Sequence, residues 1–272
     1  MNGRPPRAED ARAGHGREGG MAHGNVRDAV ADDLALQIAT GRLRAGDTLP
    51  SIRRLADRYG LNPSSVQQVL TRLRLAGFVE PRHGVGVVVR DIRLYGGIQT
   101  WQYLFRFSSS LPELTVRNVQ EILETLQLFY QAALVKLIPG SDRPRPDGAD
   151  PAPARRAFAQ LELLARSDAV RAADVHQGVL GVLRAVLAGL GGGVTLGLLN
   201  SMGDVLAEVP EVLEALYGDA SEHVYFWGNV ITAWETADAD LARSTLALLD
   251  DWHALALGRL RDRLAAGTTG TG

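Results

Sequence analysis

Residues 61–77, with the sequence LNPSSVQQVLTRLRLAG, predict a helix whose beginning and end are both marked by residue type. Asn62 is a suitable N-cap because its side-chain oxygen can accept hydrogen bonds from the free amides of the first turn. Pro63 fits the first helical position, where a missing N–H costs nothing and the fixed φ already suits a helix. Gly77 stands where a residue in the left-handed conformation commonly ends a helix.

This predicted helix has one apolar face and one polar face. At helical spacing, the apolar face comprises Val66, Val69, Leu70 and Leu73. The remaining positions carry hydroxyls, amides and guanidiniums, on Ser64, Ser65, Gln67, Gln68, Thr71, Arg72 and Arg74. Such groups form hydrogen bonds with base edges and phosphates in a DNA major groove. An ordinary amphipathic surface helix would show the same pattern.

The segment before this helix favours the DNA-binding interpretation. Residues 49–60 predict a second, shorter helix with Ser51 as its N-cap and Gly60 at its end. Only a tight turn separates the two helices. Two short helices joined by a glycine-containing turn form a helix-turn-helix unit.

A hairpin and a further helix complete the predicted domain. Residues 78–90 contain two short β-branched runs around a tip at His83 and Gly84, which predicts a β-hairpin. Residues 26–40 predict a first helix, and its inner face carries Val30, Leu34 and Ile38. A helix, a helix-turn-helix unit and a hairpin in this order form a winged helix-turn-helix domain.

These residues resemble the GntR family of bacterial transcription regulators. The resemblance runs from Val30 to about Val89 and includes the segment GRLRAGDTLPS at 41–51, Arg53, Leu55, Ala56, Gly60, Val66, Leu70, Leu73, Gly77, Gly84 and Gly86. It implies that DNA is contacted by the second helix, by the start of the recognition helix and by the wing tip. FadR-type members usually carry arginines early in the recognition helix, where Pro63 and Gln67 stand here, so the operator sequence stays undetermined.

The resemblance and the polar face together give the residues expected to contact DNA. They are Ser51, Arg53, Arg54, Asn62, Pro63, Ser64, Ser65, Gln67, Gln68, Arg72, His83 and Gly84. Residues 42–90 hold nine arginines and three acidic residues, a net charge of +6 in a chain whose overall charge is −2. The positive charge is therefore concentrated where phosphates would be met, and the rest of the chain carries about −8.

Composition sets broad limits on the protein. Its 272 residues suggest one or two domains, and an apolar content of 46% is enough to form real cores. No apolar run approaches the length that crosses a membrane, and the N-terminus lacks the apolar segment of a secretory signal. The chain has no cysteine, which rules out disulfides and cysteine-based zinc sites and fits a cytoplasmic protein.

The chain is expected to be mainly α-helical and to divide into five parts. Residues 1–24 predict a disordered tail, in which Met21 could be an alternative start. The others are a winged helix domain at 25–91, a linker at 92–97, an all-helical effector-binding and dimerisation domain at 98–266, and a tail at 267–272. In the helical domain an exposed loop is expected at 141–153, and helices at 114–138, 154–166, 168–190, 194–208, 210–217, 220–236 and 238–265.

This organisation resembles the FadR subfamily, whose helical bundle surrounds a ligand cavity. Many members hold a metal there with an Asp and a His one turn apart and two later histidines. The resemblance places Ala172 at the Asp position, and Trp227 and Leu249 at the later histidine positions, so no metal or other cofactor is expected. Histidines that could still form a displaced zinc or nickel site are His176, His223 and His253.

The same substitutions make the expected cavity apolar. Leu126 falls where many members carry an arginine that binds a carboxylate. An apolar cavity suits a hydrophobic effector, such as the fatty acyl-CoA that FadR binds. The expected lining is Leu126, Tyr130, His176, Leu199, Trp227 and Trp234, with Phe129, Val179 and Leu183 beside them. Plain core packing without any cavity would use the same residue types.

Three classes of function compete. The leading one is a repressor or activator that responds to a small-molecule effector and binds double-stranded DNA, at an inverted repeat, as a homodimer. The alternatives are a metal-containing regulator that senses a small organic acid, and a DNA-binding dimer without an effector. An enzyme is not expected. Aminotransferase-like fusions of GntR domains need a Schiff-base lysine and far more chain, and the single lysine, Lys136, lies in a long predicted helix.

Overall fold

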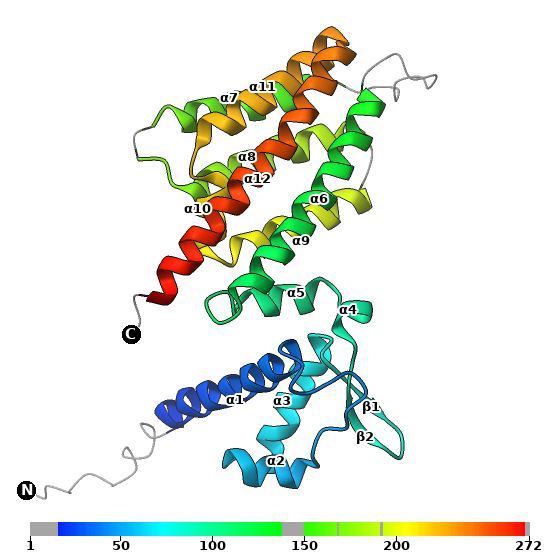
Figure 1. The fold of residues 1–272 in the computed structure, drawn as a ribbon, viewed down its shortest axis with the longest axis vertical. Helices are drawn as coiled ribbons and strands as arrows, with labels where there is room; N and C mark the ends of the chain where they lie inside the picture. The colour runs from blue at the N-terminus through cyan, green and yellow to red at the C-terminus, as the bar shows by residue number, and fades with distance from the viewer. Residues whose placement is uncertain (1–15, 138–149, 168, 191–192, 270–272) are drawn as a thin grey trace, which may run out of the picture. The chain divides into compact units, whose positions relative to one another are not determined.

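The structure is a computed structural model that describes residues 16–137, 150–167, 169–190 and 193–269. In these residues the chain forms twelve α-helices and one two-stranded antiparallel sheet, so the predicted mainly α fold is confirmed (Figure 1). The chain divides into two compact units, residues 1–100 and residues 101–272. None of the described helices combines the length and the hydropathy needed to span a membrane.

Three helices form the body of the first unit. They are α1 (Gly16–Ala39), α2 (Ile52–Tyr59) and α3 (Pro63–Leu75), and both α1 and α2 pack against α3. The inner face of α1 is buried as predicted, through Val30, Leu34 and Ile38. From α3 the core receives the four residues of its apolar face, Val66, Val69, Leu70 and Leu73.

The helix ends that residue type predicted are confirmed. Asn62 caps α3, because its Oδ1 accepts a hydrogen bond from the backbone N–H of Ser65 at 2.8 Å. Ser51 caps α2 by accepting from the N–H of Arg54 at 3.4 Å. Gly60, with φ of 64°, makes the left-handed turn between the helices, a conformation that costs a residue with a Cβ about 1–2 kcal/mol.

The wing is a short hairpin of β1 (Val79–Arg82) and β2 (Gly86–Val89), and Val79 lies opposite Val89. The segment before α2 joins it, which the sequence did not predict. Gly46 N–H donates to the carbonyl of Val89 at 2.9 Å, and Leu49 N–H donates to Val87 at 2.8 Å. In return, Val89 N–H donates to the carbonyl of Asp47 at 2.9 Å, and an isolated bridge pairs Thr48 with Val88, so this segment is tied to β2.

The segment after the wing is partly helical, although residues 92–97 were predicted to be a linker. Asp91 caps α4 (Ile92–Tyr95) through its Oδ1, which accepts from two backbone amides of that turn. In α5 (Ile98–Phe105), Thr100 is buried and its hydroxyl donates to the carbonyl of Ala76 at 2.7 Å. The chain is thereby fastened to the end of α3 before the second unit begins.

The second unit is helical throughout the part that the structure describes, as predicted. After α5 come α6 (Pro112–Leu137), α7 (Ala152–Ala165), α8 (Ala172–Ala188), α9 (Gly193–Ala207), α10 (Pro210–Tyr217), α11 (Ala220–Thr236) and α12 (Ala239–Thr269). The last of these runs along α6 and α11 and also packs against α10 (Figure 1). On the other side of the bundle, α8 packs against α7 and α10.

Two helix starts differ from their predictions. Helix α1 begins at Gly16, inside the predicted disordered tail, because each residue added to an existing helix gains a hydrogen bond without a new nucleation cost. Helix α8 begins at Ala172 and not at 168, since Arg171 has an extended backbone with φ of −98° and ψ of 150°. Helix α12 continues to Thr269, into the predicted tail at 267–272. Residues 1–15, most of the predicted loop at 141–153, and residues 270–272 lie outside the described residues.

Candidate functional site

The start of α3 presents the polar surface that the sequence predicted to contact DNA. Its side chains point away from the core because the apolar face of the same helix is buried against α1 and α2. On this helix the exposed members of the predicted set are Asn62, Pro63, Ser64, Gln67 and Gln68. Ser65 is half-buried. The first turn of α3 therefore offers an amide, a hydroxyl and a second amide on one surface.

Two predicted DNA contacts farther along α3 already have partners on α1. Arg72 forms an ion pair with Asp28, and the side-chain amide of Gln68 accepts a hydrogen bond from Arg27. These contacts join residues more than forty positions apart, so local sequence patterns could not predict them. They place Gln68 and Arg72 on the side of α3 that faces α1, away from the polar surface of its first turn.

The first turn of α2 contributes two exposed arginines, Arg53 and Arg54. Among the described residues neither guanidinium has an ion-pair or hydrogen-bond partner. By contrast, Arg58 lies over the ring of Tyr59, with its guanidinium carbon 5.3 Å from the ring centre. Arg53 and Arg54 are therefore cations available to a partner such as a phosphate.

The wing tip exposes backbone rather than charge. His83 and Gly84 are both exposed, and Gly84 has φ of 74°, which a glycine adopts without strain. Arg82, next to the tip, donates through Nε to Glu80 at 2.8 Å. The surface of the first unit thus combines free guanidiniums on α2, amides and hydroxyls on α3, and an exposed turn. Such groups bond phosphates and base edges.

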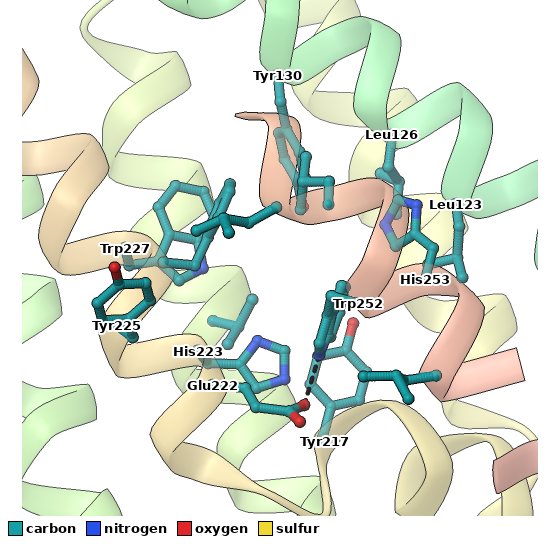
Figure 2. A pocket seen from close by; sticks show the side chains of 15 residues that line it. Leu123, Leu126, Tyr130, Tyr217, Glu222, His223, Tyr225, Trp227, Trp252 and His253 are labelled. Carbon is teal, nitrogen blue, oxygen red and sulfur yellow. Dashed lines mark hydrogen bonds between the residues drawn. The ribbon is translucent and has the colours of Figure 1, made fainter. Parts of the chain in front are cut away.

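A second candidate site is a cavity of about 230 Å³ inside the helical unit. Helices α6, α11 and α12 supply most of its wall, and Figure 2 shows the lining side chains around an open centre. Its lining consists of Leu123, Leu126, Tyr130, Val179, Tyr217, Glu222, His223, Tyr225, Phe226, Trp227, Leu248, Leu249, Trp252, His253 and Leu255. Leucines and aromatic rings dominate, which is typical of sites for apolar ligands.

One carboxylate stands in this wall, and it is already bound by neighbouring side chains. Glu222 of α11 accepts a hydrogen bond from the Trp252 indole N–H at 2.5 Å, drawn as the dashed line in Figure 2. Arg259 donates to both of its oxygens, at 2.7 and 3.1 Å. This bidentate pair ties α11 to α12 and neutralises the carboxylate.

The three histidines of the unit are linked by aromatic rings and do not converge on one point. The ring centre of Tyr217 lies 4.6 Å from that of His176 and 4.9 Å from that of His223. On the far side, Trp252 lies 5.1 Å from His223 and 5.3 Å from His253. Tyr217 and Trp252 therefore separate the histidines from each other.

Burial keeps these imidazoles neutral. It lowers the pKa of His176 and of His253 to about 4, and it lowers the pKa of His223. The backbone of Gly203 only partly opposes the shift at His176, and its geometry falls short of a hydrogen bond. No group of three or more His, Asp or Glu side chains in the described residues could hold a metal ion. These histidines thus do not fit the metal site of the FadR-type pattern.

Part of the predicted effector lining surrounds the cavity and part does not. Leu126, Tyr130, Val179 and Trp227 line it. His176, Leu199 and Trp234 are only 1% exposed and lie in the packed core instead, and Phe129 and Leu183 are also outside the lining. Trp234 lies two turns beyond Trp227 on the same face of α11, where its ring packs against Gly189.

Most of the cavity wall that α11 and α12 supply was not predicted from the sequence. Tyr225, Phe226, Leu248, Trp252 and Leu255 had no assigned role, and His223 and His253 were considered only as metal ligands. The dense aromatic run HVYFW at 223–227 was the available signal. It could have indicated a wall of rings beside the expected cavity.

Comparisons with known proteins agree on the first unit. Residues 26–89 match the model of the family described as "Bacterial regulatory proteins, gntR family". The chain is 31% identical over 106 residues to the uncharacterized HTH-type transcriptional regulator YhcF of Bacillus subtilis, which covers 38% of this chain and 87% of YhcF. It is 31% identical over 153 residues to the HTH-type transcriptional regulator Mce2R of Mycobacterium tuberculosis, covering 56% of this chain.

The chain spans about half the length of Mce2R, because the matched region covers 55% of that protein.

Among solved structures, one described by the words "Lar controls the expression of the Listeria monocytogenes agr system and mediates virulence" is 13% identical. The similarity covers 85% of this chain and 95% of that chain, with a TM-score of 0.48, which is too low to add to the assignment. The two sequence relatives are named as regulators and support the expectation that the protein is not an enzyme.

Proposed function

Because the chain belongs to the GntR family of bacterial regulatory proteins, we propose that it regulates transcription by binding double-stranded DNA through its winged helix-turn-helix unit. The observation that carries this proposal is the exposed polar start of α3 beside two arginines of α2 that have no partner among the residues the structure describes. Arg53 and Arg54 contact phosphates, while Ser64 and Gln67 reach base edges in the major groove.

The protein binds its operator as a homodimer in this proposal. Operators of helix-turn-helix regulators are inverted repeats because a two-fold protein presents two identical recognition helices. The helical unit provides the dimer contact, and the site of action is the cytoplasm, where the DNA is. Both statements rest on the family and on the presence of a second, all-helical unit.

The cavity of the helical unit receives the effector, and an apolar lining favours a hydrophobic one. A fatty acyl-CoA, the first expectation, has less support, because the lining contains no Arg or Lys to meet its phosphates. Effector binding shifts the population of dimers toward a spacing of recognition helices that no longer fits successive major grooves.

A DNA-binding dimer without any effector is the second candidate. The observation in its favour is the size of the cavity, about 230 Å³, which is smaller than the sites that hold drug-sized ligands. A regulator that senses an organic acid through a metal has no support in the histidine geometry described above.

DNA binding is tested by selecting sequences from random duplexes with the intact protein and measuring their affinity by fluorescence anisotropy. We expect an inverted repeat to be enriched and its affinity to fall by at least about 100-fold between about 50 and 200 mM salt, because bound phosphates release counterions. Sedimentation of the complex gives its stoichiometry. Failure to bind any duplex at low salt would refute the proposed function.

A further inference from the structure

The cavity wall has no positive charge to offer a ligand. Of its lining residues only Glu222 is acidic and none is Arg or Lys. Arg259 is outside the lining and is committed to Glu222 by two hydrogen bonds. The two lining imidazoles are neutral near pH 7, because burial lowers the pKa of His253 to about 4 and also lowers that of His223. A carboxylate or phosphate entering this cavity would lose its hydration without gaining a counter-charge.

His223 supplies a hydrogen-bond acceptor at the centre of this wall. Its Nε2 lies 2.9 Å from the carbonyl oxygen of Leu216, which can only accept, so Nε2 carries the proton. A neutral imidazole has one N–H, and Nδ1 is therefore an acceptor. The side chain is 5% exposed, and among the described residues the hydrogen bond of this ring is made by Nε2, not by Nδ1. Figure 2 shows this nitrogen turned toward the open centre of the cavity.

The neighbours of His223 hold its ring in this orientation. Tyr217 stacks on it, with the ring planes 16° apart, and Trp252 meets it edge-on at 84°. Trp252 is itself fixed by its hydrogen bond to Glu222. An acceptor that is held in place by its neighbours and lacks a protein donor can take a hydrogen bond from a molecule bound in the cavity.

An apolar path leads from this acceptor to the surface. Leu123 and Leu126 of α6 form one wall of the cavity, and Trp227 of α11 lies opposite them, in edge contact with Tyr130 (Figure 2). Three lining residues are exposed to solvent: Tyr225 at 63%, Leu248 at 42% and Leu255 at 59%. Since they both line the cavity and reach solvent, they mark its mouth, between α11 and α12.

We propose that this cavity binds an uncharged, mainly apolar molecule whose hydroxyl or amide N–H donates a hydrogen bond to Nδ1 of His223, and whose apolar chain extends toward the mouth. The inference deepens the effector site of the proposed function and rests on it. It separates this ligand from the organic-acid anions and acyl-CoA thioesters considered above. A carboxylate has no proton to donate, and neither a carboxylate nor the phosphates of CoA would meet a cation in the lining.

Three ligands of equal chain length test this assignment on the intact protein: decanol, methyl decyl ether and decanoate. Binding is followed by tryptophan fluorescence, since Trp227 and Trp252 both line the cavity. Decanol is expected to bind about tenfold more tightly than the ether, which has no donor, a ratio typical of one hydrogen bond to a buried acceptor. Decanoate at pH 8 is expected to bind more weakly than decanol.

Two variants assign the acceptor. His223→Phe keeps a flat ring beside Tyr217 but removes Nδ1, so decanol should lose its advantage over the ether while the ether still binds. His253→Phe is the matched control, a second buried histidine of the same wall, and it should leave the advantage intact. Loss of the preference in His253→Phe alone would overturn the assignment to His223.

The ligand comparison on the unaltered protein does not depend on whether either variant folds. Tighter binding of decanoate, equal binding of decanol and ether, or no binding of decanol would each overturn the inference. The affinity of the same preparation for its selected operator is measured without ligand. If DNA binding persists, the proposed regulator stands and only the assigned ligand class has failed.

Discussion

Gly77 shows how much a single position can constrain this fold. Its φ is +82°, and a Cβ added there would lie 2.7 Å from the hydroxyl oxygen of Thr100. That oxygen cannot easily move, because the hydroxyl donates to the carbonyl of Ala76. The end of α3 and the start of α5 are in contact at this point, so a side chain here would disturb both.

We expect Gly77→Ala to lower the free energy of unfolding by about 2 kcal/mol or more, from backbone strain and the displaced threonine together. Gly60→Ala is the control: its φ is +64°, but nothing lies within 4 Å of the added Cβ, so only the strain of about 1 kcal/mol remains. Urea denaturation compares the two. Equal losses would show that the contact with Thr100 does not matter.

Arg53 is expected to contribute to DNA affinity and not to the stability of the fold. Its guanidinium has no intramolecular partner in the described residues, so Arg53→Ala removes a DNA contact without breaking the fold. Operator affinity should fall by roughly tenfold or more, and the slope of log affinity against log salt should decrease by about 1. Arg156→Ala, an exposed arginine of α7 in the helical unit, controls for charge. Unchanged anisotropy titrations for Arg53→Ala would remove that residue from the interface.

The lowered pKa of buried His176 is expected to make the stability of the protein depend on pH. Its pKa is about 4 in the folded protein and about 6.5 in an unfolded chain, so between these values the unfolded state binds more protons. Stability is therefore full above about pH 6.5 and is lost as the pH falls toward 4, by about 3 kcal/mol for this group. His176→Phe should flatten the loss between pH 7 and 5 in urea titrations. A variant with the unaltered slope would contradict the assignment.

Helices α11 and α12 are joined by an ion pair, and the stability that such a pair contributes depends on its hydrogen bonds and on its exposure to solvent. Arg259 bonds both oxygens of Glu222, which also accepts from Trp252. Arg263, one turn later on α12, lies 3.9 Å from Glu214, and both side chains are about half exposed. We expect Arg259→Ala to cost about 1–2 kcal/mol and Arg263→Ala less than about 0.5. Chemical denaturation that ranks Arg263→Ala as the more damaging change would contradict this.

Local signals made the first unit predictable from its sequence. Asn62, Pro63 and Gly60 act within one or two turns, so the ends of α2 and α3 follow from residue type alone. The cap geometry, the buried face of α3 and the hairpin were all predicted and are confirmed. What the sequence did not reveal are contacts between segments far apart, such as the bond of Gln68 with Arg27 and the pairing of Thr48 with Val88.

The lining of the cavity, by contrast, could be predicted only in part from the sequence. Leu126 and Leu199 are the same residue type on amphipathic helices, yet one lines an opening and the other is 1% exposed in the core. Which of them borders a void depends on how each helix is rotated and how its neighbours pack. Periodicity gives the buried face of a helix but not the place along it where packing is incomplete. For that reason Trp227 was assigned correctly to the lining, whereas Trp234 was not.

For the whole molecule, the proposed function requires that the cavity and the DNA surface be coupled, although they belong to different units. A ligand shifts the conformational equilibrium only by its difference in affinity for the two states. A side chain that fills the cavity should therefore separate DNA binding from the response to ligand.

We expect Leu126→Trp, which places a larger side chain in the cavity of about 230 Å³, to keep operator affinity within about threefold of the unaltered protein. The variant should no longer bind decanol, and decanol should no longer change its DNA affinity. Leu163→Trp, at an exposed leucine of α7, tests the effect of an added tryptophan elsewhere. If Leu126→Trp still responded to the alcohol, the effector would have to bind at another place.

The bridge between Thr48 and Val88 has a consequence for how the proposed DNA surface would fit a duplex. Backbone hydrogen bonds from residues 46–49 fasten β2 to the segment that leads directly into α2. We therefore expect the hairpin and the arginines at the start of α2 to keep a nearly constant span when DNA binds. A duplex whose groove is too wide or too narrow for that span would lose both contacts together, so base sequences that alter groove width would be discriminated even at positions that no side chain touches.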